Sequence, residues 1–190
     1  MTTYTLEYPP AQSDTYVKAT TKYDTSRWPY YATDPAKTLT GAASANSWLC
    51  LNGTTTNQRF HIDLGSELII RRIYYENFHS SGGSTNAGGK NIIFQGSNSA
   101  AAFAELTYAT DTNWTALTLD ASTLDQHVAL DQVDPKYILV ANSIAYRYYA
   151  LKIANNYDNA NYMGLRRIVL QTEDGYSPPA SAFTPKIIMF

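Results

Sequence analysis

Cysteine is nearly absent from this sequence, and charge of either sign is scarce. Among 190 residues Cys50 is the only cysteine, so no disulfide can form within the chain. Next to Trp48 and Leu49, we expect it to be a small buried apolar residue. Charged side chains make up 16% of the chain, below the roughly one quarter that is usual. The net charge is −2 and there is no basic stripe, which argues against a nucleic-acid partner.

Long apolar runs are absent as well. No segment approaches the roughly 20 apolar residues that a membrane-spanning helix needs. The first ten residues, MTTYTLEYPP, lack the charged head and apolar run of a signal peptide. We therefore predict no transmembrane segment and no visible signal peptide, and we do not expect a membrane partner.

Residues that enzymes use for catalysis do not form a recognisable set. The three histidines, His61, His79 and His127, lie far apart, and no His/Cys spacing typical of a zinc site occurs. There is no Gly-x-Ser-x-Gly nucleophile motif, and the glycine-rich run from 82 to 90 lacks the spacing of a phosphate loop. We therefore predict no catalytic residue, no metal ligand and no enzymatic activity. His61 and Asp63 are interpreted as a hydrogen-bonded structural pair.

The stretch QRFHIDLGSELIIRRIYYEN, residues 58 to 77, has the strongest local pattern. Phe60, Ile62 and Leu64 alternate with polar residues, which is typical of a half-buried strand. Gly65-Ser66 then breaks the pattern. The β-branched and aromatic run that follows favours a second strand.

Turn residues separate further short segments with strand character. Because the segments are many and no long helix is predicted, the sequence indicates an all-β sandwich. The additional strands are predicted at 15–23, 91–97, 106–109, 114–119, 136–141, 146–153 and 164–171, with one helical turn at 100–105 and a short helix within 120–132.

Three loops between these strands carry aromatic or amide side chains. The chain contains 16 tyrosines, and a tyrosine ring with its polar tip suits recognition surfaces, although tyrosine is also a common strand residue. Loops of this length in a small domain are usually functional or mobile. The loops are 24–35, 78–90 and 154–163.

The two ends of the chain differ from the middle. Residues 1 to 16 begin as an irregular arm that contains Pro9-Pro10, and proline cannot donate to a sheet. Residues 176 to 190 form a Pro/Ser/Ala-rich tail with an apolar end, which we expect to dock on the domain or on a partner. The domain itself is assigned to residues 17 to 175. The candidate docking residues are Ile187, Ile188, Met189 and Phe190.

Several of these segments, in this order, resemble the discoidin domains, also called coagulation-factor C-type domains, and the related family 32 carbohydrate-binding modules. The likeness extends over roughly residues 17 to 175. In this resemblance Trp48 and Trp114 occupy core positions. The segments that carry it are Trp48, Gln58–Gly65, Ile69–Ile73, Gly89–Asn98, Asn113-Trp114, Tyr146–Tyr148 and Gly164–Leu170.

The resemblance implies an antiparallel jelly-roll β-sandwich of about eight strands, here with extended terminal arms. Ligands of such domains bind in loops at one end, opposite the termini. Aromatic rings there can pack on a sugar ring while Asn and His bind its hydroxyls. The candidate ligand-binding residues are Trp28, Tyr30, Tyr31, Phe78, His79, Asn86, Tyr157, Asn159 and Tyr162.

The chain departs from the family pattern at two features. Many relatives close the domain with a disulfide, which a single cysteine cannot form. Many sugar-binding relatives hold a structural calcium with an Asp-Gly turn and a Glu in the last strand. Here Thr40-Gly41 replaces the turn, and Arg166 or Arg167 replaces the Glu. Arginine has no acceptor for a metal ion, so we predict no cofactor.

These observations favour a non-enzymatic binding or structural module over an enzyme. The leading hypothesis is a surface subunit of a phage or viral particle, such as a capsid decoration, fibre or tail component. Its terminal arms would bind other subunits, and its loops would face cell-surface glycans. The alternative is a free lectin or the carbohydrate-binding module of a secreted system. A virion-surface or extracellular location fits both hypotheses.

Overall fold

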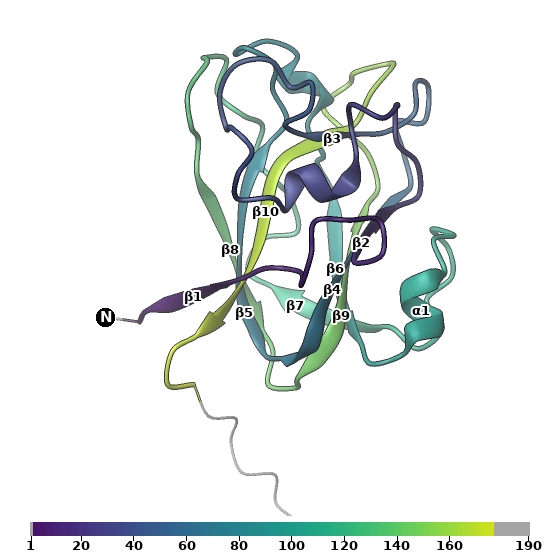
Figure 1. Cartoon of the computed structure of the whole chain (residues 1–190), viewed down its shortest axis with the longest axis vertical. Helices are drawn as coiled ribbons and strands as arrows, with labels where there is room; N and C mark the ends of the chain where they lie inside the picture. Colours follow the sequence, from purple (N-terminus) through teal and green to yellow (C-terminus); the bar gives the residue numbers. More distant parts are fainter. Residues whose placement is uncertain (1, 177–190) are drawn as a thin grey trace, which may run out of the picture.

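The computed structural model describes residues 2 to 176, so the apolar end from Ile187 to Phe190 lies outside the described residues. The described part is an all-β structure with ten strands (Figure 1). The strands are β1 (Tyr4–Glu7), β2 (Val17–Ala19), β3 (Trp48–Leu49), β4 (Gln58–Leu68), β5 (Ile70–Asn77), β6 (Ile92–Ser97), β7 (Thr115–Leu119), β8 (Lys136–Ala141), β9 (Tyr146–Ile153) and β10 (Gly164–Glu173). Three short helices, η1 (Pro29–Ala32), η2 (Thr85–Ala87) and α1 (Ala100–Ala104), lie in the connections.

The strands form one antiparallel sheet that curls into two layers. Its order is β1-β10-β5-β8-β7-β6-β9-β4-β2, and β3 pairs separately with β10. β4 and β5 are consecutive in the chain but lie in different layers, because β4 pairs with β2 and β9 whereas β5 pairs with β10 and β8. This arrangement confirms the predicted jelly-roll sandwich. The strand number is ten rather than about eight, because the very short β1 and β3 also pair with β10.

The irregularity in β4 between Asp63 and Leu68 contains one glycine that the local structure requires. Gly65 has a φ of +77°, and a Cβ atom there would lie 2.5 Å from Pro10 Cγ. Glycine is therefore needed both for the backbone conformation and for the close approach of the N-terminal segment.

The core lies between the two layers and is rich in aromatic and β-branched side chains. Trp48 is fully buried and packs edge-to-face on Phe60, and its indole N–H donates to the carbonyl oxygen of Thr21. Cys50 is buried in the same cluster, as predicted. Trp114, in contrast, lies outside this cluster. It packs against His61 on the outer face of the layer that contains β2, β4, β9 and β6, which we call the second layer.

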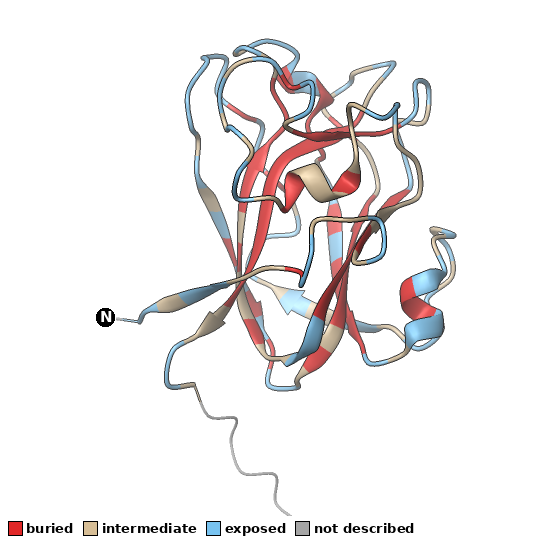
Figure 2. Ribbon diagram, viewed as in Figure 1, coloured by how far each residue is buried: buried red, intermediate tan, exposed pale blue. Residues whose placement is uncertain are grey.

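The polar face of β4 is buried, so the prediction of a half-buried strand was wrong. His61 is 0% and Asp63 5% exposed, because α1 and the segment after it cover this face (Figure 2). His61 Nδ1 contacts the carbonyl oxygen of Phe103 at 2.9 Å. Asp63 instead forms a two-point ion pair with Arg147, at 2.8 and 2.9 Å. The predicted His61–Asp63 hydrogen bond is therefore absent.

Three local predictions also differ from the structure. Residues 4 to 7 of the presumed arm form β1, an edge strand on β10. Residues 106 to 109 are not a strand, because the carbonyl oxygens of Thr107 and Tyr108 accept hydrogen bonds from the buried Arg59 guanidinium. Residues 120 to 132 contain no helix, since backbone groups of this segment bond to neighbouring elements, as in Leu124 N–H to Lys90 O.

The connections at residues 78–91, 120–135 and 154–163 lie at one end of the sandwich, while the β4–β5 turn lies at the other (Figure 1). The connection at 20–47 reaches the same end as these loops, but its helix η1 lies on the flank (Figure 1). A backbone bridge at Gly89–Asn156 joins the loop at 78–91 to the loop at 154–163, and another at Gly88–Gly164 joins the 78–91 loop to the first residue of β10. Among residues 2 to 176, no helix has the length and apolar character required to cross a membrane.

Candidate functional site

A cavity of about 240 Å³ lies among the loops at this end; we call it the loop-end pocket. It is formed where the segment after β2, the short strand β3, the loop after β5 and the loop before β10 meet. Its lining combines aromatic, hydroxyl and cationic side chains. The lining residues are Tyr23, Arg27, Leu49, Phe78, Ser80, Ser84, Ala87 and Tyr162.

Aromatic and aliphatic side chains form the apolar part of the loop-end pocket. Tyr23 and Tyr162 meet edge-to-face with ring centroids 5.5 Å apart. Tyr23 is 40% exposed, so its ring is accessible from solvent. Phe78 is buried and packs with Leu49 and Ala87 in a small cluster separate from the main core. The pocket thus has accessible rings above a rigid apolar floor.

Arg27 supplies the only cation among the residues lining the loop-end pocket. Its Nη1 donates to the carbonyl oxygen of Ser26 at 3.1 Å, and its Nε is buried without a hydrogen-bond partner. Burial lowers the pKa of Arg27 from its usual value, while the nearby Asp24 carboxylate opposes this effect. An arginine remains protonated at neutral pH, so the loop-end pocket is lined by one positive charge.

The loop that carries the serines is held in a tight conformation. Ser80 and Gly83 exchange backbone hydrogen bonds, each of 2.9 Å. Ser81 and Ser84 have φ angles of 49° and 55°. This is a left-handed backbone conformation that residues other than glycine seldom adopt. Such strain persists only where the surrounding structure enforces it, often at ligand sites.

Arg166 fixes the base of these loops with its positive charge. It is fully buried, and its guanidinium donates to the carbonyl oxygens of Thr38, Thr40 and His79. A cage of carbonyl oxygens around a cation is also how proteins hold calcium, but here the cation is the protein's own. The residues present therefore do not fit a calcium ion. Among residues 2 to 176, no three His, Cys, Asp or Glu side chains gather as a metal site.

His79 lies behind the loop-end pocket rather than in it. Its ring is buried and stacks on His127 with centroids 4.0 Å apart. Nε2 contacts the carbonyl oxygen of Leu39 at 2.8 Å, and Nδ1 accepts from the Gly82 N–H at 3.1 Å. Burial lowers the pKa of His79. This residue joins three loops and does not face a ligand.

Hydrogen bonds from the Asn159 side chain hold the 154–163 loop, which precedes β10, in its conformation. Asn159 Oδ1 accepts from the backbone N–H groups of Asn161 and Tyr162, and its Nδ2 donates to Asn86 at 3.1 Å. The Tyr157 hydroxyl donates to the carbonyl oxygen of Leu124 at 2.5 Å. Asn159 therefore positions Tyr162, while Tyr157 is committed to an internal contact.

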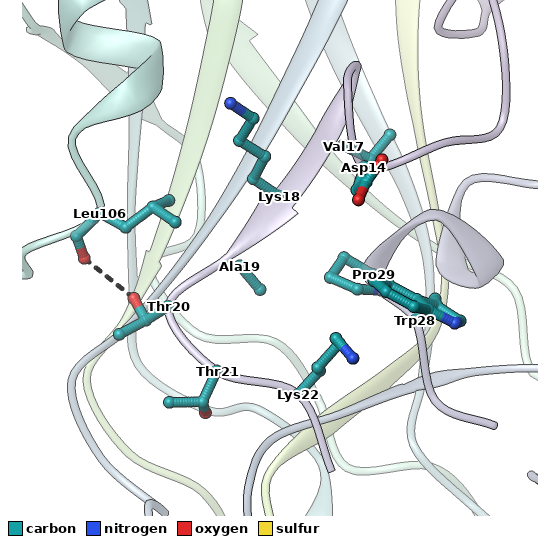
Figure 3. A pocket seen from close by; sticks show the side chains of 10 residues that line it. All are labelled: Asp14, Val17, Lys18, Ala19, Thr20, Thr21, Lys22, Trp28, Pro29 and Leu106. Atoms are coloured by element: carbon teal, nitrogen blue, oxygen red, sulfur yellow. Dashed lines mark hydrogen bonds between the residues drawn. The ribbon is translucent and has the colours of Figure 1, made fainter. Parts of the chain in front are cut away.

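The aromatic residues of the 24–35 loop lie elsewhere, on the flank of the sandwich. A cavity of about 430 Å³, the flank cavity, lies beside β2, with Trp28 and Pro29 on one side and Leu106 on the other (Figure 3). The Trp28 ring stacks with Tyr30 and also lies under Lys22 Nζ, 3.6 Å from its centroid. Lys37 similarly covers Tyr31. These rings are thus engaged within the protein.

The structure brings together part of the predicted set. Phe78 and Tyr162 line the loop-end pocket, and Asn86 and Asn159 pair beside it. Trp28, Tyr30 and Tyr31 do not join them. Sequence reasoning missed Tyr23 and Arg27, because Tyr23 was assigned to a strand and Arg27 has no neighbouring motif. The signal available in the sequence was a tyrosine followed four residues later by an arginine at the start of the 24–35 loop.

Comparisons with known proteins identify the fold. No family model matches the sequence, and no curated protein matches it. Solved structures do match. The family 32 module from C. perfringens NanJ, in complex with galactose, has a TM-score of 0.60 and 10% identity over 90% of this chain and 100% of that chain.

Two further structures support the same assignment. The Streptococcus pneumoniae β-galactosidase BgaA structure has a TM-score of 0.65 at 10% identity, over 87% of this chain and 97% of that chain. A chitosan-binding module from a Paenibacillus chitosanase/glucanase has a TM-score of 0.55 at 15% identity, over 82% and 92%. At these identities the likeness establishes the fold, which is the discoidin-like jelly roll of family 32 carbohydrate-binding modules.

Proposed function

We propose that this protein is a non-enzymatic glycan-binding module whose sugar site is the loop-end pocket. The observation that carries the proposal is the pairing of accessible tyrosine rings with an incompletely hydrogen-bonded arginine in one cavity. The fold adds support, because the solved structures that share it include modules bound to sugars.

The chemistry of the lining suits a single sugar ring. Pyranoses have an apolar face of C–H groups that packs on aromatic rings, and hydroxyls that need donors and acceptors. Tyr23 and Tyr162 provide the rings, while Arg27, Ser80 and Ser84 provide polar groups. A pocket of about 240 Å³ has room for one terminal residue rather than for several units of a chain.

The same lining argues against glycoside hydrolysis. That reaction needs two carboxyl groups placed on either side of the glycosidic bond. Among the described residues that line the loop-end pocket there is no Asp or Glu. Binding without chemistry is therefore the function that these residues support.

The experiment is a glycan array with the purified protein, run with calcium and again with chelator. We expect binding that survives chelation, because Arg166 supplies the cation of the loop base. Tyr162→Ala should weaken binding about tenfold, a typical value for one lost ring contact. Tyr31→Ala serves as the matched control on the flank. Absence of binding, or loss of binding only in Tyr31→Ala, would overturn the assignment.

We also propose, as a finer hypothesis, that the module is one subunit of a larger assembly such as a phage or viral particle. The supporting observation is β1, an edge strand whose outer side pairs with no strand among residues 2 to 176. Leu6 on this strand is 49% exposed, and open edges of this kind accept strands from other chains. Leu6→Lys should abolish self-association in native mass spectrometry, and a monomeric wild-type protein would contradict the hypothesis.

A further inference from the structure

The outer face of the layer formed by β1, β10, β5 and β8 carries a second set of aromatic side chains. Strand pairing places Val169, Tyr74 and Tyr137 side by side across three strands. Tyr74 and Tyr137 are 5.6 Å apart with their rings inclined by 56°. Tyr137 is 52% exposed, and the Arg72 guanidinium lies 4.5 Å from its ring centroid, so this face combines a partly open ring with a nearby cation.

A cavity of about 310 Å³ opens on this face; we call it the sheet-face cavity. One wall is the N-terminal segment, and the floor is formed by β10 and β5. The cavity shares no lining residue with the loop-end pocket. The lining residues are Leu6, Tyr8, Pro35, Tyr74, Tyr137, Arg167, Val169 and Gln171.

Arg167 in this cavity is a buried cation without an ion-pair partner. The side chain is 5% exposed, and its Nη2 donates to the carbonyl oxygen of Lys37 at 2.6 Å. Its Nε is buried and makes no hydrogen bond. In the described part of the chain, no carboxylate lies within ion-pair distance of it. A buried charge without a paired carboxylate is costly, so binding of an anion from outside the protein would be favourable.

Asp34 and Glu76 are the carboxylates whose charge acts on Arg167, and Glu76 is already engaged. Glu76 is the cross-strand partner of Arg167 on β5. Its Oε1 accepts from the Tyr74 hydroxyl at 2.7 Å, and its Oε2 accepts from the Asp134 N–H at 2.6 Å. Glu76 therefore moderates the local potential without supplying hydrogen-bond acceptors to the guanidinium. Burial, as the largest influence, lowers the pKa of Arg167, and it remains protonated at neutral pH.

We propose that the sheet-face cavity is a second carbohydrate site, specific for a uronic acid residue of an acidic polysaccharide. The sugar ring packs on Tyr137 and Tyr74, and its carboxylate pairs with Arg167. A neutral hexose would leave the guanidinium without a counter-charge. An inorganic anion would leave the tyrosine rings unused. A ring that bears a carboxylate uses both features.

The test uses the full chain labelled with ¹⁵N and short oligomers of galacturonate, mannuronate and guluronate as probes. We expect at least one probe to cause saturable chemical-shift changes at β5, β8 and β10. The methyl ester of the same oligomer, in which a neutral ester replaces the carboxylate, should bind about tenfold more weakly or not at all. Raising the salt concentration should weaken binding of the acid form.

Three variants test this site and separate it from the loop-end pocket. Tyr137→Ala changes an exposed ring and should keep the fold while weakening uronate binding about tenfold. Tyr23→Ala, the matched control at 40% exposure, should leave uronate binding unchanged. Arg167→Gln should abolish the preference for the acid over the ester. Absence of saturable shifts with every probe, equal binding of the ester, or shifts confined to the loop-end pocket would each overturn the proposal.

Discussion

The Arg166 side chain binds the backbone of His79: its Nη1 donates to the His79 carbonyl oxygen at 3.2 Å. The same guanidinium holds the carbonyl oxygens of Thr38 and Thr40. Two loops that are far apart in sequence therefore depend on one buried positive charge. Because this charge is covalently part of the chain, the loop end needs no external cation.

Replacing Arg166 by methionine should destabilise the protein by about 3 kcal/mol, since three buried carbonyl oxygens would lose their donor. Thermal and urea unfolding measure this effect. Arg71→Met is the control, because Arg71 pairs with Glu173, with 25% of each side chain exposed, and donates to one carbonyl oxygen, that of Asn142, rather than to three; its loss should cost about 1 kcal/mol. The melting temperature of the wild-type protein should not change with calcium or chelator. A rise with calcium would contradict the role given to Arg166.

Stability should fall as the pH is lowered from about 7 towards 4, with His61 as one cause. Burial lowers the pKa of His61 to about 4, whereas an unfolded histidine titrates near 6.5. Between these values the unfolded state binds more protons, so stability decreases as the pH falls, by up to about 3 kcal/mol from this residue. Urea unfolding at several pH values measures the slope. His61→Gln should flatten it, and an identical slope in both proteins would exclude His61 as the cause.

Asp111 neutralises two buried cations on the outer face of the second layer. Its carboxylate accepts from Arg59 at 2.5 Å and from Lys152 at 2.8 Å, while the Arg59 and Lys152 side chains are 0% and 6% exposed. Asp111→Asn should cost about 2 kcal/mol, less than a fully buried pair because Asp111 is itself 48% exposed. Urea unfolding would show this loss. Asp158→Asn, an exposed aspartate with a positive φ that Asn tolerates, should be neutral. Equal effects of the two changes would refute the role of Asp111.

The fold was predictable because its signal is distributed over many residues. The alternation around Phe60 and the ordered segments up to residue 170 specify strands and their sequence. The burial of His61 and Asp63 was not predictable, because it depends on a covering segment some forty residues later in the chain. The loop-end pocket was partly predictable: Phe78 and Tyr162 belong to loops that the fold brings together. Arg167 gave no signal beyond its departure from the family pattern, since its isolation from carboxylates appears only in three dimensions.

The conformation of the loop-end pocket should depend on Gly82 more than on other glycines with the same backbone conformation. Gly82 has a φ of +75°, and a Cβ there would lie 2.7 Å from backbone atoms of Leu130 and Asp131. Gly82→Ala therefore adds a collision with rigid backbone to the strain of a positive φ. The 80–84 loop must move away, which displaces Ser80 and Ser84 from the pocket that they line.

Gly53→Ala isolates the contribution of the backbone conformation, because Gly53 has a φ of +80° and a Cβ atom added there would have no neighbouring atom within 4 Å. Both variants should lose about 1 kcal/mol from the positive φ alone. Only Gly82→Ala should also lose sugar affinity, by about tenfold or more, in titrations with the best ligand from the array. If both variants retain full affinity, the 80–84 loop does not shape the site, and the sugar contacts must come from Tyr23, Arg27 and Tyr162 alone.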